Sequence, residues 1–226
     1  ERLHEGERNY LVQHGDERAK AEWALLKERQ NWLNLANRRR QSRPLLQRKD
    51  PSWTAAEAYE NVFFLHQLST TWLVLSADGA AFALDGSGGN VASELAELQH
   101  SGKIRALEGL WISHYHDDHV DGVPALKTRF DCPVFADGHV AQVVEHPEAW
   151  QLPCLSPAQV RVDHVTQHGE TWQWHEFSFT AYHLPGQTLY HGGLLVEGRG
   201  QRILFAGDSF TPTGIDDYCA GNRNPL

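Results

Sequence analysis

An apolar segment that ends in a cluster of histidines restricts the fold of this chain more than any other feature. Leu107–Ser113 has the length and apolar character of a buried strand, and the sequence His-Tyr-His-Asp-Asp-His follows it at once. If the pleat of the strand continues, His114 and His116 point to the same side, and Asp118 and His119 leave the strand end on a tight loop. Three imidazoles and a carboxylate so close together suit zinc or iron in an open site. The sequence therefore predicts a metal site at a strand end, in preference to a histidine-rich surface loop.

Short apolar segments punctuated by Gly and Asp follow residue 55 and predict alternating strands and helices. Strands are expected over Asn61–Leu68, Thr71–Ser76, Ala80–Leu84, Leu107–Ser113, Pro133–Ala136, Glu176–His183, Gly192–Glu197 and Arg202–Ala206. Helices are expected over Val91–Gln99, Val120–Arg129 and His139–Glu145. This order fits layered sheets that are covered by helices, which is an α/β (α+β) architecture.

The first part of the chain differs from the rest. Arg18–Arg40 has good helix formers and apolar residues at helical spacing, which predicts an amphipathic helix, and Gln41–Ser52 with its prolines reads as a linker. We therefore expect residues 1–54 to form a helical extension and linker, and residues 55–226 to form a second domain. The helix is a candidate lid, cap or contact between the subunits of a homo-oligomer.

Composition narrows the possible partners. Lys and Arg number 20 against 29 Asp and Glu, and a net charge of −9 argues against nucleic acid as a partner. No apolar run approaches the roughly 18 residues needed to cross a bilayer. The three cysteines, Cys132, Cys154 and Cys219, form no C-x-x-C pair, which favours a reducing compartment and a cytoplasmic location.

Three segments together resemble the motifs of the metallo-beta-lactamase-fold hydrolases, in the order in which that family has them. The histidine cluster resembles the family's H-x-H-x-D-H motif, Phe82–Ser87 its first motif, and Leu204–Ser209 its fourth motif, where Asp208 takes the bridging position as in the glyoxalase II set. The resemblance spans about residues 60 to 210. It implies an αβ/βα sandwich, in which two mixed sheets pack face to face, helices lie outside, and metals bind at one sheet edge.

The resemblance also implies a ligand set and a chemistry. His114 and His116 would hold one metal, Asp118 and His119 a second, and Asp208 would bridge them, with Asp85 supporting the metal-binding loop. The cofactors would be two divalent ions, zinc in the first place, with iron or manganese as alternatives. A metal-bound hydroxide would attack an ester, thioester, lactone or amide of a small molecule, and Asp118 could orient it and pass a proton to the leaving group.

The sequence departs from the family pattern in its third motif. That motif usually carries a metal-binding histidine in a Pro-Gly-His-Thr loop, and here Gln187 stands in its place. A glutamine amide is a weak zinc ligand, so the metal is either held loosely or held by a neighbour. His191 is the preferred substitute and His183 the second, and Gln187 itself or no third ligand are the remaining possibilities.

A second departure concerns the last ligand of the family, a histidine that would follow Asp208 after a further strand. No histidine follows Asp208 in this sequence, and the chain begins without methionine, so we expect it to be truncated within its C-terminal part.

Two other functions stay open. One is a sulfur dioxygenase with a single iron, and the other is a non-catalytic binding protein that has lost its metals.

Overall fold

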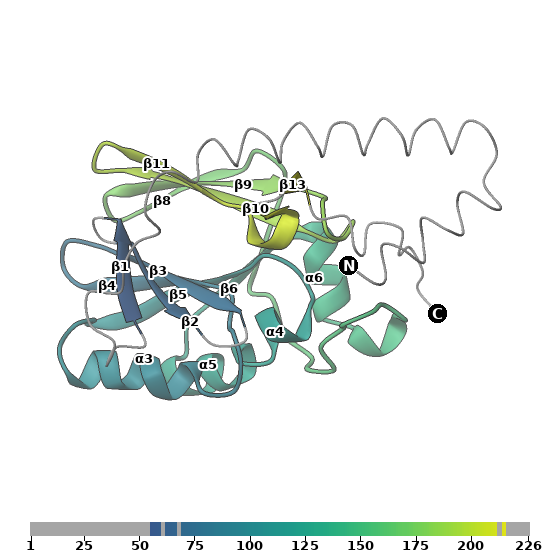
Figure 1. The fold of residues 1–226 in the computed structure, drawn as a ribbon, viewed down its shortest axis with the longest axis horizontal. Helices are drawn as coiled ribbons and strands as arrows, with labels where there is room; N and C mark the ends of the chain where they lie inside the picture. The colour runs from purple at the N-terminus through teal and green to yellow at the C-terminus, as the bar shows by residue number, and fades with distance from the viewer. Residues whose placement is uncertain (1–54, 60–61, 67–68, 212–213, 216–226) are drawn as a thin grey trace.

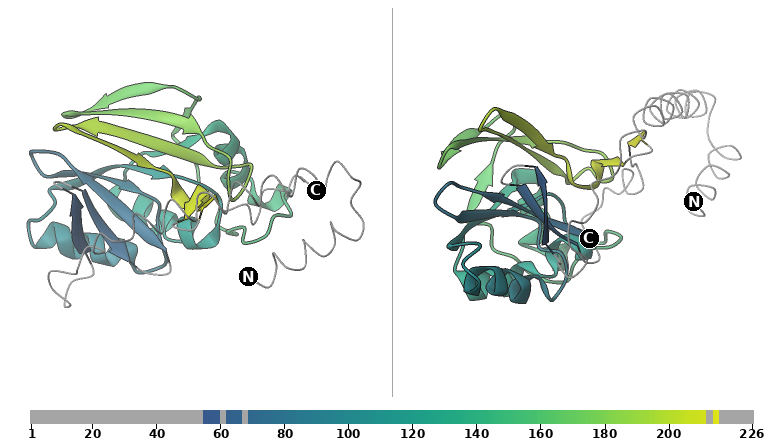
Figure 2. Two further views of the ribbon diagram at one scale, coloured as in Figure 1. Left: turned by 45° about the horizontal axis from the view of Figure 1, so that its top comes forward. Right: turned by 60° about the vertical axis from the view of Figure 1, so that its left-hand side comes forward.

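The structure is a computed structural model that describes residues 55–59, 62–66, 69–211 and 214–215. Within these residues a seven-stranded and a four-stranded sheet pack face to face, and helices cover the other face of the larger sheet (Figures 1 and 2). The predicted α/β sandwich is therefore confirmed. The predicted N-terminal helix lies outside the described residues, and the domain boundary after residue 54 stays a prediction.

The larger sheet has its strands in the order of the chain. They are β1 (Ala55–Tyr59), β2 (Val62–His66), β3 (Thr70–Leu75), β4 (Ala80–Leu84), β5 (Ala106–Ile112), β6 (Val134–Asp137) and β7 (His164–Thr166). Strands β1 to β4 pair antiparallel, and β4 to β7 pair parallel. The parallel strands end at one edge of the sheet, which is where open α/β sheets bind their ligands.

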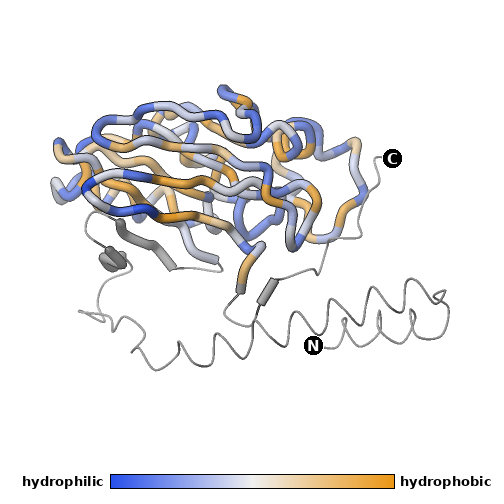
Figure 3. Tube along the Cα trace, turned by 90° about the horizontal axis from the view of Figure 1, so that it is seen from above, coloured by the Kyte–Doolittle hydropathy of each residue, from blue (hydrophilic) through white to orange (hydrophobic). Residues whose placement is uncertain are grey.

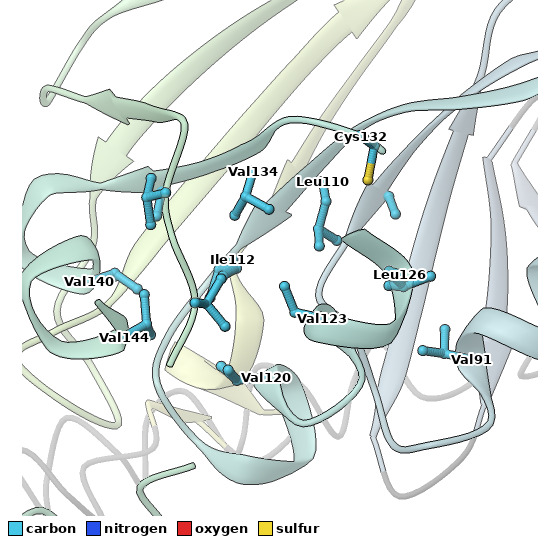
Figure 4. Packing of buried hydrophobic residues seen from close by; sticks show 14 of the residues in the cluster. Val91, Leu110, Ile112, Val120, Val123, Leu126, Cys132, Val134, Val140 and Val144 are labelled. Atoms are coloured by element: carbon cyan, nitrogen blue, oxygen red, sulfur yellow. The ribbon is translucent and has the colours of Figure 1, made fainter. Parts of the chain in front are cut away.

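Helices connect the parallel strands, because a parallel pair needs a crossover. They are α3 (Val91–His100), α4 (Asp117–Val120), α5 (Val123–Phe130) and α6 (Gly138–Val144), followed by the 3₁₀ turn η1 (Pro147–Ala149). Their buried side chains pack on the sheet in one apolar cluster, part of which Figure 4 shows around Ile112, Val123 and Val134. No helix in the described part of the chain is long and apolar enough to span a membrane.

The smaller sheet is antiparallel, in the order β11-β10-β9-β8. Its strands are β8 (Thr171–Trp174), β9 (Phe177–His183), β10 (Gly192–Gly198) and β11 (Gln201–Phe205), and η2 (Gly207–Ser209), β12 (Phe210–Thr211) and β13 (Gly214–Ile215) follow. A second apolar cluster fills the space between the sheets, where the rings of Phe82 and Phe179 lie 4.8 Å apart. Hydrophobic residues follow the strands, and hydrophilic residues gather at the turns (Figure 3).

One predicted helix, Val120–Arg129, is divided in the structure. The histidine cluster ends in the helical turn α4, where a tight loop was expected, and α5 begins at Val123. Gly122 separates them because it packs against a neighbouring loop: a Cβ there would lie 2.4 Å from the carbonyl oxygen of Gly88. The prediction also omitted β1, β7, β8, β12 and β13, and β7 is a three-residue strand that exposes Val165.

Asp163 holds the start of β6 in place through hydrogen bonds. Its carboxylate accepts hydrogen bonds from Lys127 Nζ on α5 and from the backbone N–H of Val134 at 3.0 Å. Partial burial opposes ionisation, but the hydrogen bonds from Lys127 and Val134 and the nearby charges of Lys127 and Arg161 together outweigh it and lower the pKa of Asp163. A carboxyl group whose pKa is lowered by folding stabilises the protein above its unfolded pKa, and that contribution is lost as the pH falls through the folded pKa.

We expect Asp163→Asn to lower the free energy of unfolding by about 1 kcal/mol at pH 7. The difference from the unmodified chain should shrink as the pH falls below about 4, where the carboxylate becomes neutral as well. Urea denaturation at pH 7 and at pH 3 to 4 measures this, with the exposed Asp131→Asn as a control of equal charge change. An equal loss of stability at both pH values would show that the charge of Asp163 is not responsible.

Candidate metal centre

Strand ends from the two sheets come together at one edge of the sandwich. His114 follows β5, and its backbone forms an antiparallel bridge with His191, which precedes β10. The N–H of Gly192 donates to the carbonyl oxygen of Ser113 at 2.7 Å. Strand β11 runs antiparallel to β10, so its end, which leads into Asp208, lies at this same edge. Residues distant in sequence therefore converge at one edge of the sandwich (Figure 1).

The side chains of His114, His119 and Asp208 form the centre of this group. One donor atom from each lies within 4.8 Å of the other two. The Nε2 atom of His119 is 3.4 Å from Asp208 Oδ2 and 3.6 Å from Asp118 Oδ2. The ring of His116 lies 4.5 Å from that of His114, centroid to centroid. The histidines are buried and Asp118 is partly exposed, so the group is open on the side of its carboxylates.

The three residues weighed for the third motif have different surroundings. The ring of His191 is fully buried and stacks on His114 at 4.7 Å, and neither of its nitrogens has a hydrogen-bond partner among the described residues. Gln187 Nε2 donates to Asp208 Oδ2 at 3.3 Å. His183 lies elsewhere, because its ring stacks on His139 at 3.9 Å. The structure thus brings His191 and Gln187 to the group and directs His183 away from it.

Asp85 connects to two of the histidines through hydrogen bonds. Its Oδ1 accepts the N–H of Ser113 at 2.7 Å, and its Oδ2 accepts the Ser113 hydroxyl at 2.7 Å and Nδ1–H of His119 at 2.8 Å. Because the only hydroxyl hydrogen of Ser113 goes to Asp85, His114 Nδ1, 2.9 Å away, must donate to Ser113 Oγ. In their neutral forms, His114 and His119 therefore both turn an unprotonated Nε2 toward the group, as metal-binding histidines do.

Sequence reasoning missed Ser113, although its position directly before the first histidine could have singled it out. It also missed the serine that holds the other end of the cluster. The hydroxyl of Ser69 donates to the carbonyl oxygen of Asp118 at 2.6 Å, and Ser69 N–H donates to Ser87 Oγ at 3.0 Å. These contacts depend on segments far apart in the chain. They position the backbone of Asp118 from outside the motif.

Burial determines the protonation of two histidines. It lowers the pKa of His114 well below its usual value, and the neighbouring His119, His191 and His116 lower it further. Burial likewise lowers the pKa of His191 to about 4, although Asp85 opposes the shift. Both imidazoles are therefore neutral at neutral pH and carry a lone pair that a metal ion can use.

At the other members of the group, burial and nearby charges act together on the pKa. Burial opposes protonation of His119, but Asp85 and Asp208 outweigh it and raise its pKa to about 10, so a metal ion must displace a proton there. Burial, and then the nearby carboxylates of Asp208 and Asp117, raise the pKa of Asp118 against the effect of His119. Burial also opposes ionisation of Asp208, but His119 and Gln187 lower its pKa. The two carboxyl groups thus differ in acidity, although both border His119.

Gly207 lets the backbone pass close to the histidines. Its φ is +49°, and a Cβ at this position would lie 2.7 Å from His191 Nε2 and 2.7 Å from Ser113 Oγ. A side chain would therefore collide with the group. This requirement was not visible in the sequence, because it depends on the contact between the ends of β5, β10 and β11.

The residues fit a divalent transition metal. Imidazole nitrogens and carboxylate oxygens are ligands that zinc and iron accept, and three or more of them with an open side are typical of catalytic sites. Nε2 of His114 is buried without a hydrogen-bond partner among the described residues. Such an atom costs free energy unless a ligand satisfies it. The donor set and this buried nitrogen both favour a bound cation.

The comparison with known families agrees with the fold. The sequence pattern of the metallo-beta-lactamase superfamily matches residues 68–218. The chain belongs to the metallo-beta-lactamase superfamily. Solved metallo-beta-lactamases have the same fold: the one from Novosphingobium pentaromativorans superposes with a TM-score of 0.60 at 21% identity, covering 73% of this chain and 64% of that one. The one from Cronobacter sakazakii gives 0.61 at 18% identity, covering 71% and 64%.

Curated relatives are more similar in sequence. The hydroxyacylglutathione hydrolase of Xanthomonas euvesicatoria pv. vesicatoria is 27% identical over 146 residues, which are 63% of this chain and 47% of that protein. The hydroxyacylglutathione hydrolase of Vibrio campbellii is 29% identical over 155 residues, 69% of this chain and 52% of that protein. The chain thus spans about half the length of these relatives.

Proposed function

We propose that this chain carries the metal centre of a hydrolase that cleaves a small-molecule acyl compound. The convergence of His114, His119 and Asp208 on one point is the observation that supports this most directly. A thioester is the preferred substrate class, because a hydroxyacylglutathione, which the curated relatives are named for hydrolysing, is a thioester. Esters, lactones and amides are the other classes open to the same chemistry.

The ligand assignment follows the motif order. His114 and His116 are proposed to hold one ion, Asp118 and His119 a second, and Asp208 to contact both. Zinc, or iron or manganese, would supply Lewis acidity that polarises a carbonyl group and makes water nucleophilic at neutral pH. We propose His191 in place of the third-motif histidine; its ring stacks on His114 with an interplanar angle of 18°, so it would have to turn to direct a nitrogen at the same ion. It is buried, its pKa of about 4 keeps it neutral, and its nitrogens lack partners among the described residues.

The protein groups around the ions have separate tasks in this proposal. Asp118 is partly exposed and its pKa is raised, which suits a group that takes a proton and passes it to the leaving group. The lowered pKa of Asp208 keeps that carboxylate ionised, and Gln187 holds it by donating to Oδ2. Asp85 fixes the ring of His119 through Nδ1–H. Gln187 thus positions Asp208, and no ligand role is assigned to it.

The remaining proposals concern the cellular location of the protein, its oligomeric state and its partners. A cytoplasmic location is supported by the thiols of Cys132 and Cys154, which form no disulfide in the described part of the chain. Contact between copies through the helix predicted over residues 18–40 stays a prediction, because these residues lie outside the described ones. Nucleic acid is not expected as a partner, given the net charge of −9.

The proposal is tested on the protein purified without chelators. We expect about two divalent ions per chain, release of thiol from a small acyl thioester, loss of this activity on chelation, and recovery on addition of zinc. One iron per chain with consumption of oxygen would favour the dioxygenase alternative and contradict the hydrolase. Protein that holds no metal and cleaves none of the four substrate classes would favour the non-catalytic alternative.

A further inference from the structure

A second group of metal-binding side chains lies at the same edge of the sandwich. Asp137 ends strand β6, His139 lies in the first turn of α6, and His183 ends β9; one donor atom from each lies within 4.8 Å of the other two. His183 pairs across the sheet with Gly192, whose Cβ, if present, would be 3.1 Å from the Cβ of Asp137. The group is thus next to the metal centre but shares no residue with it.

His183 is held in the form that a metal ligand needs. Its Nε2 is 2.9 Å from the carbonyl oxygen of Leu189, which can only accept a hydrogen bond. Nε2 therefore carries the proton, and Nδ1 of the neutral ring has a free lone pair. A backbone carbonyl that fixes the second nitrogen in this way is typical of histidines that bind metals.

Asp137 supplies a buried negative charge. Its side chain is 2% exposed, and its Oδ1 accepts hydrogen bonds from the backbone N–H and the Nδ1–H of His139, both at 2.9 Å. No lysine or arginine in the described part of the chain forms an ion pair with it. A buried carboxylate is costly unless it is paired or coordinates a cation. The site therefore favours a cationic ligand and disfavours an anion.

His139 has the freedom that the other two residues lack. Its ring is 54% exposed and stacks on His183 with an interplanar angle of 12°. Two parallel stacked rings cannot both direct an in-plane lone pair at one ion, so His139 must turn about its side-chain bonds to bind. The turn breaks its bond to Asp137 Oδ1 and leaves that oxygen available for the ion.

We propose that Asp137, His139 and His183 form an additional metal site for one divalent transition ion of the zinc type. Two imidazoles and a carboxylate are a donor set that zinc accepts, and three protein ligands leave a position for water. Because His139 must first rotate away from Asp137, the site gives up a hydrogen bond when it binds its ion, which reduces its affinity. The inference does not depend on the proposed hydrolase activity.

Zinc titration of the metal-loaded protein by calorimetry tests the proposal. We expect one further equivalent of zinc to bind, and its affinity to fall at least tenfold in His139→Ala and in His183→Ala. His139→Ala removes an exposed side chain, so its folding should be unaffected, and thermal unfolding checks this. His146→Ala, at an exposed histidine beside Glu148, is the matched control and should leave the titration unchanged.

Long-range ¹H–¹⁵N NMR gives a second measurement. Zinc in excess should shift Nδ1 of His183 and Nε2 of His139, and it should do so in His116→Ala as well, where the proposed main centre is damaged. A titration with no further equivalent, or one that both variants leave unchanged, would overturn the additional site. Failure of the hydrolase proposal would instead appear as metal-loaded protein without turnover, with this binding intact.

Discussion

Replacing His116 or Asp208 by alanine is expected to abolish tight metal binding and hydrolysis together. Asp208 Oδ2 lies 3.4 Å from Nε2 of His119, and the ring of His116 lies 4.5 Å from that of His114, so each variant removes a proposed metal ligand. Lewis-acid stabilisation of a developing charge is worth several kcal/mol, and each 1.36 kcal/mol is tenfold in rate. We expect kcat/KM to fall by on the order of 10³-fold or more.

Metal content after dialysis and thioester turnover on the same samples measure this effect. His146→Ala is the control, since it removes an exposed imidazole and should keep both metal and activity. Circular dichroism verifies that the variants remain folded. Full activity in either His116→Ala or Asp208→Ala would refute the assignment of these two residues to the metal centre.

Gly207→Ala is expected to disrupt the same centre without removing any ligand. The new Cβ would lie 2.7 Å from His191 Nε2 and from Ser113 Oγ, closer than such atoms approach in proteins. Ser113 connects Asp85 to His114, so its displacement also disturbs the tautomer of that ring. Loss of such an orienting partner typically costs 10- to 100-fold in metal affinity or activity, and we expect a loss of about this size or larger.

Gly200→Ala separates this collision from backbone strain. Gly200 also has a positive φ, +75°, but a Cβ there meets no atom within 4 Å. It should therefore lose about 1 kcal/mol of stability from the left-handed backbone and retain its metal affinity. Chelator competition with zinc gives the affinities, and urea denaturation gives the stabilities. Equal metal affinities in the two variants would contradict the steric explanation.

The fold was largely predictable because most of its elements are coded by local periodicity. Apolar runs between Gly and Asp residues predicted eight strands, and each corresponds to a strand of the structure, with differences of a few residues at the ends. The exceptions are the strands that were not predicted, among them β1, β7 and β8, and the helix that Gly122 divides. Its boundary depends on contact with Gly88 across the fold, which no local pattern reports.

The metal-binding motif was visible for a similar reason. His114 to His119 are close in sequence, so the spacing of the ligand types indicates their common direction once a strand is expected before them. The supporting residues were not visible in this way. Ser69 reaches Asp118 from another part of the sheet, and Ser113 acts through Asp85, so these contacts exist only after the strands have paired.

The sequence by itself determined which metal-binding side chains are available, and the tertiary structure decided which of them lie together at one site. His183 and His191 belong to one loop region and have the same side chain, so the sequence offered both as substitutes for the missing third-motif histidine. The pairing of β9 with β10 sets His183 opposite Gly192 and beside His139, whereas the bridge to His114 holds His191 at the first centre. The physical reason is that the pleat and the register of paired strands set side-chain directions, and register is a property of two segments together.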